Sequence, residues 1–204
     1  MVPGRTRKIM NDKTDLISII CTKLLSSDVV TAKEQLISEW EFKPLSDEPS
    51  RDTIPESRQI QVFFRDKFTC QYCGKRTVFI GTLRVISILS PKEFPYHPHW
   101  KWNETHPAFW ELTSSCDHLV PVARGGKSNI DNLVTACYMC NSIKANWTLD
   151  ELRWKKHEPA DVEWDGLVGL FLQIMDHDNI QDKSLKNWYK LLKKEKISNP
   201  KFPG

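Results

Sequence analysis

The chain has 204 residues, of which 40% are hydrophobic and 27% are charged, as is typical of a globular protein and not of a disordered or collagen-like one. Its 29 basic and 26 acidic residues leave a net charge of +3, so bulk charge alone does not indicate nucleic-acid binding. No apolar run approaches the roughly 20 residues that a membrane span requires. One sizeable core, or two small ones, can be expected for this length.

The first third of the chain is predicted to be helical. One helical face is indicated by apolar residues at helical spacing, namely Leu16, Ile19, Ile20 and Leu24. A second helix, capped by Ser27 or Asp28, is expected to run to Trp40. The prolines of the stretch 41–56 then break the pattern, which predicts a linker there.

A short helix that carries Ile60, Phe63 and Phe64 is expected after the linker. The stretch 74–115 reads as an insertion, with a strand expected over Thr82 to Leu89. Its later part is rich in Trp, Tyr, His and Pro. Such clusters can stack on bases, but they more often form a satellite core under a long loop, and we favour the core.

The segment from 116 onward alternates short apolar runs with turn residues. Two short strands are predicted over 119–122 and 133–136, and a helix of about two turns over 139–146. Thr148 and Glu151 fit a capping box for a helix through Lys156. Two further helical stripes follow, with apolar residues at Leu167, Leu170, Phe171 and Ile174, and at Leu185, Trp188 and Leu192.

Four of the six cysteines form two Cys-x-x-Cys pairs, Cys70 with Cys73 and Cys137 with Cys140. Each pair can present two sulfurs to one ion, and together they can complete a tetrahedral zinc site. No export signal is evident, so a reducing compartment is expected and metal binding is favoured over disulfides. The remaining two cysteines, Cys21 and Cys116, are expected to be small buried hydrophobic residues.

The dipeptide Asp117-His118 lies between the two cysteine pairs. A histidine beside a carboxylate can activate water next to a second, catalytic metal ion. On its own such a dipeptide would mean little, because most are surface polar residues. Its place between the pairs, with Asn132 and Asn141 following, favours a metal-dependent nuclease.

These residues resemble the HNH endonuclease family. Asp117-His118, Asn132 and Asn141 stand at the positions of the family motif, and the stretch 65–74 resembles the usual entry to its first cysteine pair. The resemblance implies an α+β fold, a ββα-metal core on a four-cysteine zinc site with N-terminal and C-terminal helical segments. The expected division is a helical segment and linker at 1–56, a nuclease core at 57–147 with the insertion 74–115, and a helical segment at 148–204.

The resemblance also implies a role for each motif residue. His118 would be the general base that takes a proton from the attacking water, and Asp117 and Asn141 would hold one Mg²⁺ or Mn²⁺ ion. Asn132 would clamp the loop between the strands and orient His118. The expected activity is hydrolysis of double-stranded DNA with 5′-phosphate and 3′-hydroxyl products, in a cytoplasmic restriction or phage-defence nuclease.

Two alternatives remain open at this point. A zinc-stabilised module that binds DNA or another protein without cutting would have the same fold, because fold alone does not establish activity. An RNA nuclease is also compatible, since a general base and a metal ion need no 2′-hydroxyl. One such site cuts one strand, so a double-strand break would require a homodimer or two successive binding events.

Overall fold

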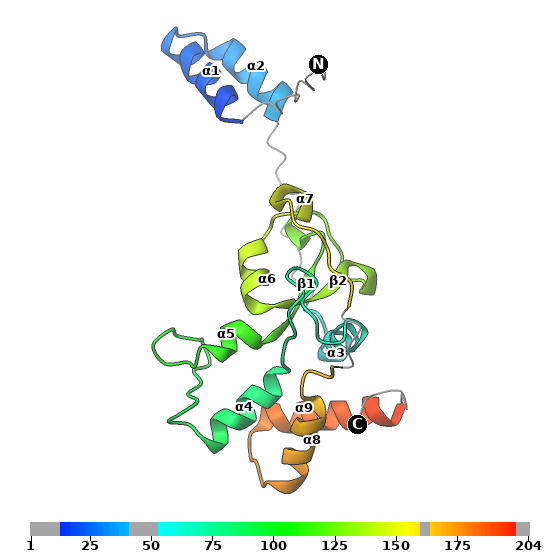
Figure 1. The fold of residues 1–204 in the computed structure, drawn as a ribbon. Helices are drawn as coiled ribbons and strands as arrows, with labels where there is room; N and C mark the ends of the chain where they lie inside the picture. The colour runs from blue at the N-terminus through cyan, green and yellow to red at the C-terminus, as the bar shows by residue number, and fades with distance from the viewer. Residues whose placement is uncertain (1–12, 41–52, 160–163, 199–204) are drawn as a thin grey trace, which may run out of the picture. The chain divides into compact units, whose positions relative to one another are not determined.

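The structure is a computed structural model that describes residues 13–40, 53–159 and 164–198. Within these residues it is an α+β protein, in which helices accompany one small antiparallel sheet (Figure 1). The chain divides into two compact units, Met1–Ser46 and Asp47–Gly204. No helix among the described residues has the length and apolar character needed to cross a bilayer.

The first unit is a pair of helices, α1 (Lys13–Leu25) and α2 (Val29–Trp40). Its small core consists of buried Leu16, Ile20 and Ala32, against which Leu36 packs. The cap expected at the start of α2 is confirmed, because Oδ1 of Asp28 accepts a hydrogen bond from the amide of Thr31 at 3.2 Å.

The apolar face predicted for α1 is only half correct. Ile19 and Leu24 are 45% and 47% exposed, because the single partner helix is too narrow to cover them. Most of the linker predicted over 41–56 lies outside the described residues.

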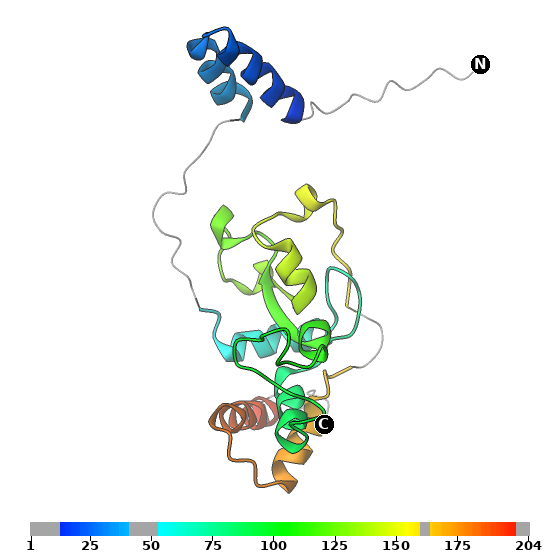
Figure 2. The same cartoon turned by 90° about the vertical axis from the view of Figure 1, so that its left-hand side faces the viewer.

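The centre of the second unit is a hairpin with a helix on each side. β1 (Ser114–His118) and β2 (Leu133–Cys137) pair in an antiparallel register that sets Ser114 opposite Cys137 and His118 opposite Leu133. Helix α6 (Tyr138–Lys144) follows β2 directly, and α3 (Glu56–Arg65) contacts both strands. Figure 2, turned by 90°, shows the hairpin between α3 and α6. The strand predicted over 133–136 and the helix predicted over 139–146 are thereby confirmed.

Helix α3 is fastened to the hairpin by polar contacts through its last turn. Arg65 donates to the carbonyls of Ile130 and Leu133, and it also pairs with Asp66 at 2.8 Å. Asp66 in turn accepts a hydrogen bond of 2.7 Å from the amide of Thr135 on β2. The short helix predicted around Ile60 and Phe63 is therefore present, and it supports the face of the sheet opposite to α6.

The strand predicted over 119–122 is wrong, because β1 lies over 114–118 instead. Pro121 has no backbone N–H for a ladder, and its carbonyl accepts bonds from Arg124 and Gly126 in a turn. Leu119 does not belong to a strand; its apolar side chain packs on the cluster that contains Tyr72 and Val134. The correction matters for function, since it moves Asp117 and His118 from a loop into a strand.

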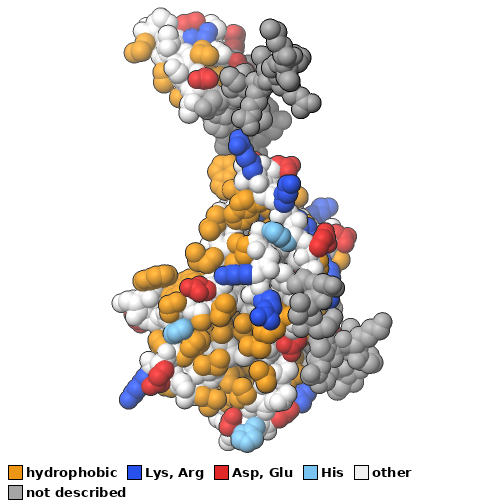
Figure 3. All heavy atoms as spheres, in the orientation of Figure 1, with side chains coloured by type: hydrophobic (Ala, Val, Ile, Leu, Met, Phe, Trp, Pro, Cys, Tyr) orange, Lys and Arg blue, Asp and Glu red, His pale blue; other side chains and the backbone are white. Residues whose placement is uncertain are grey.

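The insertion folds into helices. The strand predicted over Thr82 to Leu89 is wrong: this run forms α4 (Ile80–Leu89), because packing against α8 and α9 outweighs the strand propensity of its β-branched residues. Helix α5 (Ala108–Leu112) leads into β1. The favoured satellite core is present, built from buried Val78, Leu83 and Phe109 with Phe94, Tyr96 and Trp100 around them. Hydrophobic side chains gather over this part of the second unit in Figure 3.

The C-terminal part supplies the main core of the second unit. The predicted capping box of Thr148 and Glu151 is present, but α7 (Leu149–Leu152) ends before the expected Lys156, where Arg153 takes a left-handed conformation. Helices α8 (Val168–His177) and α9 (Lys183–Ser198) carry the two predicted stripes. Two residues of the first stripe depart from the prediction: Leu167 precedes α8 as its N-cap in a left-handed conformation, and Leu170 is 52% exposed. Phe171, Leu185 and Leu192 join residues of α3 and α4 in the core.

Candidate functional site

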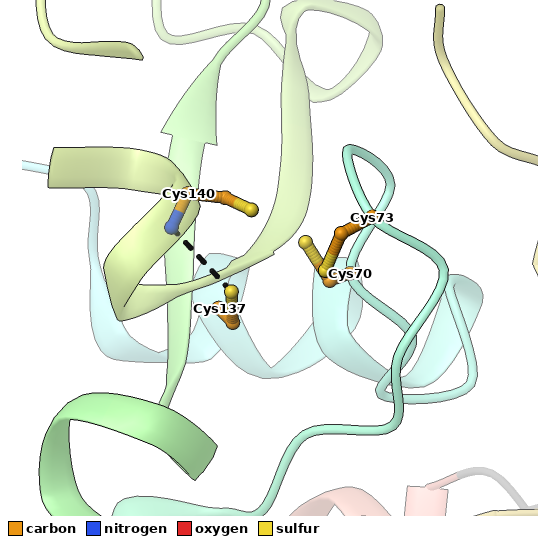
Figure 4. Close-up of side chains that lie close together, drawn as sticks. All are labelled: Cys70, Cys73, Cys137 and Cys140. Atoms are coloured by element: carbon orange, nitrogen blue, oxygen red, sulfur yellow. Dashed lines mark hydrogen bonds between the residues drawn. The ribbon is translucent and has the colours of Figure 1, made fainter. Parts of the chain in front are cut away.

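The four paired cysteines meet at one point. The sulfur atoms of Cys70, Cys73, Cys137 and Cys140 all lie within 4.8 Å of one another. Figure 4 shows that two sulfurs come from the loop after α3, and two from the end of β2 and the start of α6. The site thus ties together two segments more than 60 residues apart in the chain.

Backbone hydrogen bonds shape each cysteine turn. In the first turn the amide of Cys70 donates to the carbonyl of Lys75, and the amide of Gly74 donates to the carbonyl of Cys70. Gly74 has a φ of +74°, which a glycine adopts without strain. In the second turn the amide of Cys140 donates to the sulfur of Cys137 at 3.4 Å (Figure 4).

This donor set fits zinc. Sulfur–sulfur separations of about 3.8 Å are expected around a tetrahedral ion with Zn–S bonds of about 2.3 Å, which is compatible with the cluster. Hydrogen bonding with Cys137 lowers the pKa of the Cys70 thiol to about 5, and the same contact raises the pKa of Cys137. Metal-binding cysteines must be deprotonated, and a divalent cation is the partner that stabilises thiolates this close together.

Asp117 is buried on β1, and one of its carboxylate oxygens is engaged by two protein groups. Its Oδ2 accepts a hydrogen bond of 2.6 Å from the hydroxyl of Tyr72 and lies 3.1 Å from Nζ of Lys144. Burial and the adjacent carboxylate raise the pKa of Tyr72, so its hydroxyl stays protonated and is the donor. None of the described residues donates a hydrogen bond to Oδ1.

Asn141 lies on the surface of α6 that faces Asp117. Its Nδ2 donates to Oγ of Ser115 at 3.1 Å, and Lys144, one turn later, reaches Asp117. Ser115 and Asp117 are two residues apart on β1 and share a face of the sheet. The side-chain oxygen of Asn141 accepts no hydrogen bond from the described residues. Asp117 and Asn141 therefore lie on a strand and a helix that contact each other.

His118 is held at the end of β1 by two contacts. Its carbonyl accepts a hydrogen bond of 2.7 Å from Lys144, and its Nε2 lies 3.0 Å from the hydroxyl of Ser128. A cleft of about 540 Å³ reaches the histidine and is also lined by Ser115 and Tyr138. The ring is partly exposed, as a group that must exchange protons with a bound molecule requires.

Asn132 organises the loop that joins the two strands. Its Oδ1 accepts from the amide of Val120 at 2.9 Å, and its Nδ2 donates to the carbonyls of Val120 and Lys127 at 3.0 Å each. Gly126 is required in this loop, because a Cβ there would lie 1.8 Å from the carbonyl oxygen of Val120. The loop that carries Ser128 toward His118 is thus fixed by side-chain and backbone contacts.

Sequence reasoning missed three residues of the site. Tyr72 lay inside the first cysteine pair and Ser128 in a polar loop, so neither gave a pattern. Lys144 belongs to a residue type that is usually solvated, but its side chain is fully buried. The available signal was spacing: Lys144 is three residues after Asn141, which places both on one side of a helix.

Several other expectations are corrected or completed by the structure. Cys21 is exposed rather than buried, because it lies on the outer side of α1. Cys116 is half-buried against the main core, and burial raises its pKa to about 12. Arg124 is exposed and pairs with Glu151 at 3.2 Å, whereas His97 and His99 contact each other away from the cysteine cluster.

Comparison with protein families identifies one domain. The family model described as HNH endonuclease matches residues 108–146, which include β1, the loop, β2 and α6. The chain therefore carries an HNH endonuclease domain, and the four-cysteine cluster beside it is consistent with a zinc site. Comparison with curated proteins and with solved structures gives no match.

Proposed function

We propose that this HNH domain is an active, metal-dependent endonuclease that hydrolyses DNA phosphodiester bonds. One observation supports the proposal: Asp117 on β1 and Asn141 on the neighbouring helix α6 each keep one side-chain oxygen without a hydrogen bond from the described residues, and His118 stands at the end of the same strand. A module that only binds nucleic acid needs neither a metal-binding pair nor an adjacent imidazole.

In this proposal His118 is the general base. A neutral imidazole has one nitrogen that carries a proton and one that accepts a proton. The Ser128 hydroxyl, 3.0 Å from Nε2, orients the ring, while Lys144 fixes the backbone through the His118 carbonyl. With its ring and its backbone both positioned in this way, His118 removes a proton from the water that attacks phosphorus.

Asp117 and Asn141 would hold the catalytic ion, Mg²⁺ or Mn²⁺. Hard oxygen ligands of this kind suit either ion, and the set is small enough to leave positions for water and substrate. When bound, the ion polarises the scissile phosphate and neutralises charge on the departing 3′ oxygen. Asn132 contributes by holding the loop 120–127, so that Ser128 stays in reach of the histidine.

We propose double-stranded DNA as the substrate, with 5′-phosphate and 3′-hydroxyl ends as products. A restriction or phage-defence role in a cytoplasm would agree with such an activity. One site cuts one strand, so breaks in both strands would come from a homodimer or from two successive binding events.

A plasmid-nicking assay tests the proposal. Supercoiled DNA is incubated with the protein and Mg²⁺ or Mn²⁺, and product ends are mapped by labelling before and after phosphatase treatment. We expect nicking that EDTA abolishes and that His118→Ala reduces by at least about a hundredfold, the lower range for loss of a general base. His99→Ala, the same change at an exposed histidine, is the matched control and should retain activity.

The same assay separates the alternatives. A protein that binds DNA but never cuts it with any divalent ion would be the zinc-stabilised binding module. Cleavage of RNA in preference to DNA of the same sequence would identify an RNA nuclease.

A further inference from the structure

A second cleft, of about 590 Å³, lies beside the candidate site. It is formed by the outer side of α3 and the end of the loop between the strands, and its lining residues are Arg58, Gln61, Lys127, Ser128, Asn129 and Ile130. Five of the six are polar, two are cationic and none is acidic. A hollow of this composition attracts an anion that also accepts hydrogen bonds.

The two cations of this cleft make no ion pair with any described residue. Some other basic side chains of the described chain are paired, as Arg65 is with Asp66 and Arg84 with Asp182. Arg58 uses only one of its donors within the described residues, in a bond of 2.7 Å from Nη1 to the carbonyl of Ser128. Lys127 is exposed. Both charges are therefore available to a ligand.

The cleft is directly connected to the catalytic histidine. Ser128 is a lining residue, its hydroxyl lies 3.0 Å from Nε2 of His118, and its carbonyl is held by Arg58. The carbonyl of the neighbouring Lys127 is fixed by Asn132. One lining residue of the cleft, Ser128, is therefore in direct contact with the candidate general base.

We propose that this cleft binds a backbone phosphate of the substrate strand, next to the phosphate that is cleaved. Arg58 and Lys127 supply the charge, and the amides of Gln61 and Asn129 can donate to phosphate or sugar oxygens. Arg58 suits the task because its fork matches a phosphate, and its bond to Ser128 couples substrate binding to the position of His118. This inference rests on the proposed nuclease function and assigns its strand-binding contact.

The test measures how DNA binding depends on salt. A fluorescein-labelled duplex, and the single strand of the same sequence, are bound to the full-length protein in EDTA over a range of KCl concentrations. Each lost phosphate contact lowers the slope of log K against log[salt] by about 0.9 for a duplex and about 0.7 for a single strand. Lys127→Gln and Arg58→Gln should each lower the slope by about one contact, and Arg58→Lys should restore it.

Lys92→Gln is the matched control, because Lys92 is another exposed lysine and lies in the turn after α4, outside the cleft. In Mg²⁺ we expect Lys127→Gln to raise KM several-fold with kcat nearly unchanged, which a structural defect would not do. Wild-type slopes in both Lys127→Gln and Arg58→Gln would overturn the proposal. If Arg58→Gln fails to fold, exposed Lys127 decides the outcome alone.

Failure of the nuclease function is a separate result. Suppose that the protein never cuts DNA, but that Lys127→Gln lowers the slope of log K against log[salt]. The phosphate-binding proposal would then be supported, and the proposed role of His118 as general base would be refuted. Normal cleavage by the wild type, together with unchanged salt slopes in both variants, would support the nuclease function and refute phosphate binding in the cleft.

Discussion

The hydroxyl of Tyr72 donates a hydrogen bond of 2.6 Å to Oδ2 of Asp117. Tyr72 lies between Cys70 and Cys73, so a residue inside the first cysteine turn touches the candidate ligand of the catalytic ion. The second cysteine turn reaches the site as well, because Cys140 directly precedes Asn141. Each cysteine turn therefore contacts or adjoins one of the two candidate ligands, Asp117 and Asn141.

The first prediction concerns Tyr72→Phe, which removes only the hydroxyl. We expect the Mg²⁺ concentration for half-maximal cleavage to rise about tenfold, since outer hydrogen bonds to metal ligands typically contribute that much. Zinc content, measured by atomic absorption, should stay at one ion per chain because the sulfurs are untouched. Tyr96→Phe in the satellite core is the control. An unchanged Mg²⁺ requirement would contradict a positioning role for Tyr72.

The second prediction concerns the buried cation. Lys144 is fully buried and pairs with Asp117, whose side chain is 11% exposed. Lys144→Met leaves the carboxylate without its cation, and breaking such a pair costs about 3–5 kcal/mol. Urea unfolding should therefore show a large loss of stability. The double variant Asp117→Asn/Lys144→Met should recover much of it without cleaving DNA, and a fully stable single variant would refute the argument.

The third prediction concerns zinc. Structural zinc contributes on the order of 10 kcal/mol to the folding of small sites, comparable with the whole stability of a domain. Cys137→Ala should therefore unfold the hairpin and α6, seen as a loss of bound zinc and of cooperative melting by circular dichroism. Cys21→Ala, at an exposed cysteine of the first unit, should melt like the wild type. A folded Cys137→Ala protein that cleaves DNA would rule out this role.

The sequence indicates the site better than the elements around it. The cysteine cluster could be predicted because two Cys-x-x-Cys turns specify their own geometry. β2 could be predicted because an apolar run marks it, and α6 because the segment after β2 has room for about two helical turns. β1 could not, since its residues are mostly polar and its pairing with β2 is decided by long-range contacts. Helix α4 was missed for a similar reason: a β-branched run became a helix because α8 and α9 pack on it.

Charges inside the site were also beyond sequence reasoning. Nothing in the local pattern says that Lys144 turns inward to meet Asp117, because the pairing depends on how α6 docks on β1. The same holds for Ser128, which reaches His118 only through the folded loop.

The last prediction follows from that buried pair. The charges of Asp117 and Lys144 cancel, and Asn141 is neutral, so the protein offers a divalent ion almost no net negative charge. Mg²⁺ should therefore bind weakly to the protein alone and more tightly when a DNA phosphate supplies the missing charge, by a factor of about 5 to 150.

Calorimetric titration of Mg²⁺ into the protein, with and without a phosphorothioate duplex that resists cleavage, measures this factor. The linkage is reciprocal, so Mg²⁺ must strengthen DNA binding by the same ratio, which anisotropy measures independently. Asp117→Asn should weaken Mg²⁺ binding both with and without DNA, because its neutral side chain leaves the charge of Lys144 uncompensated beside the ion. Equal Mg²⁺ affinities with and without DNA would show that charge neutralisation in this site does not govern metal binding.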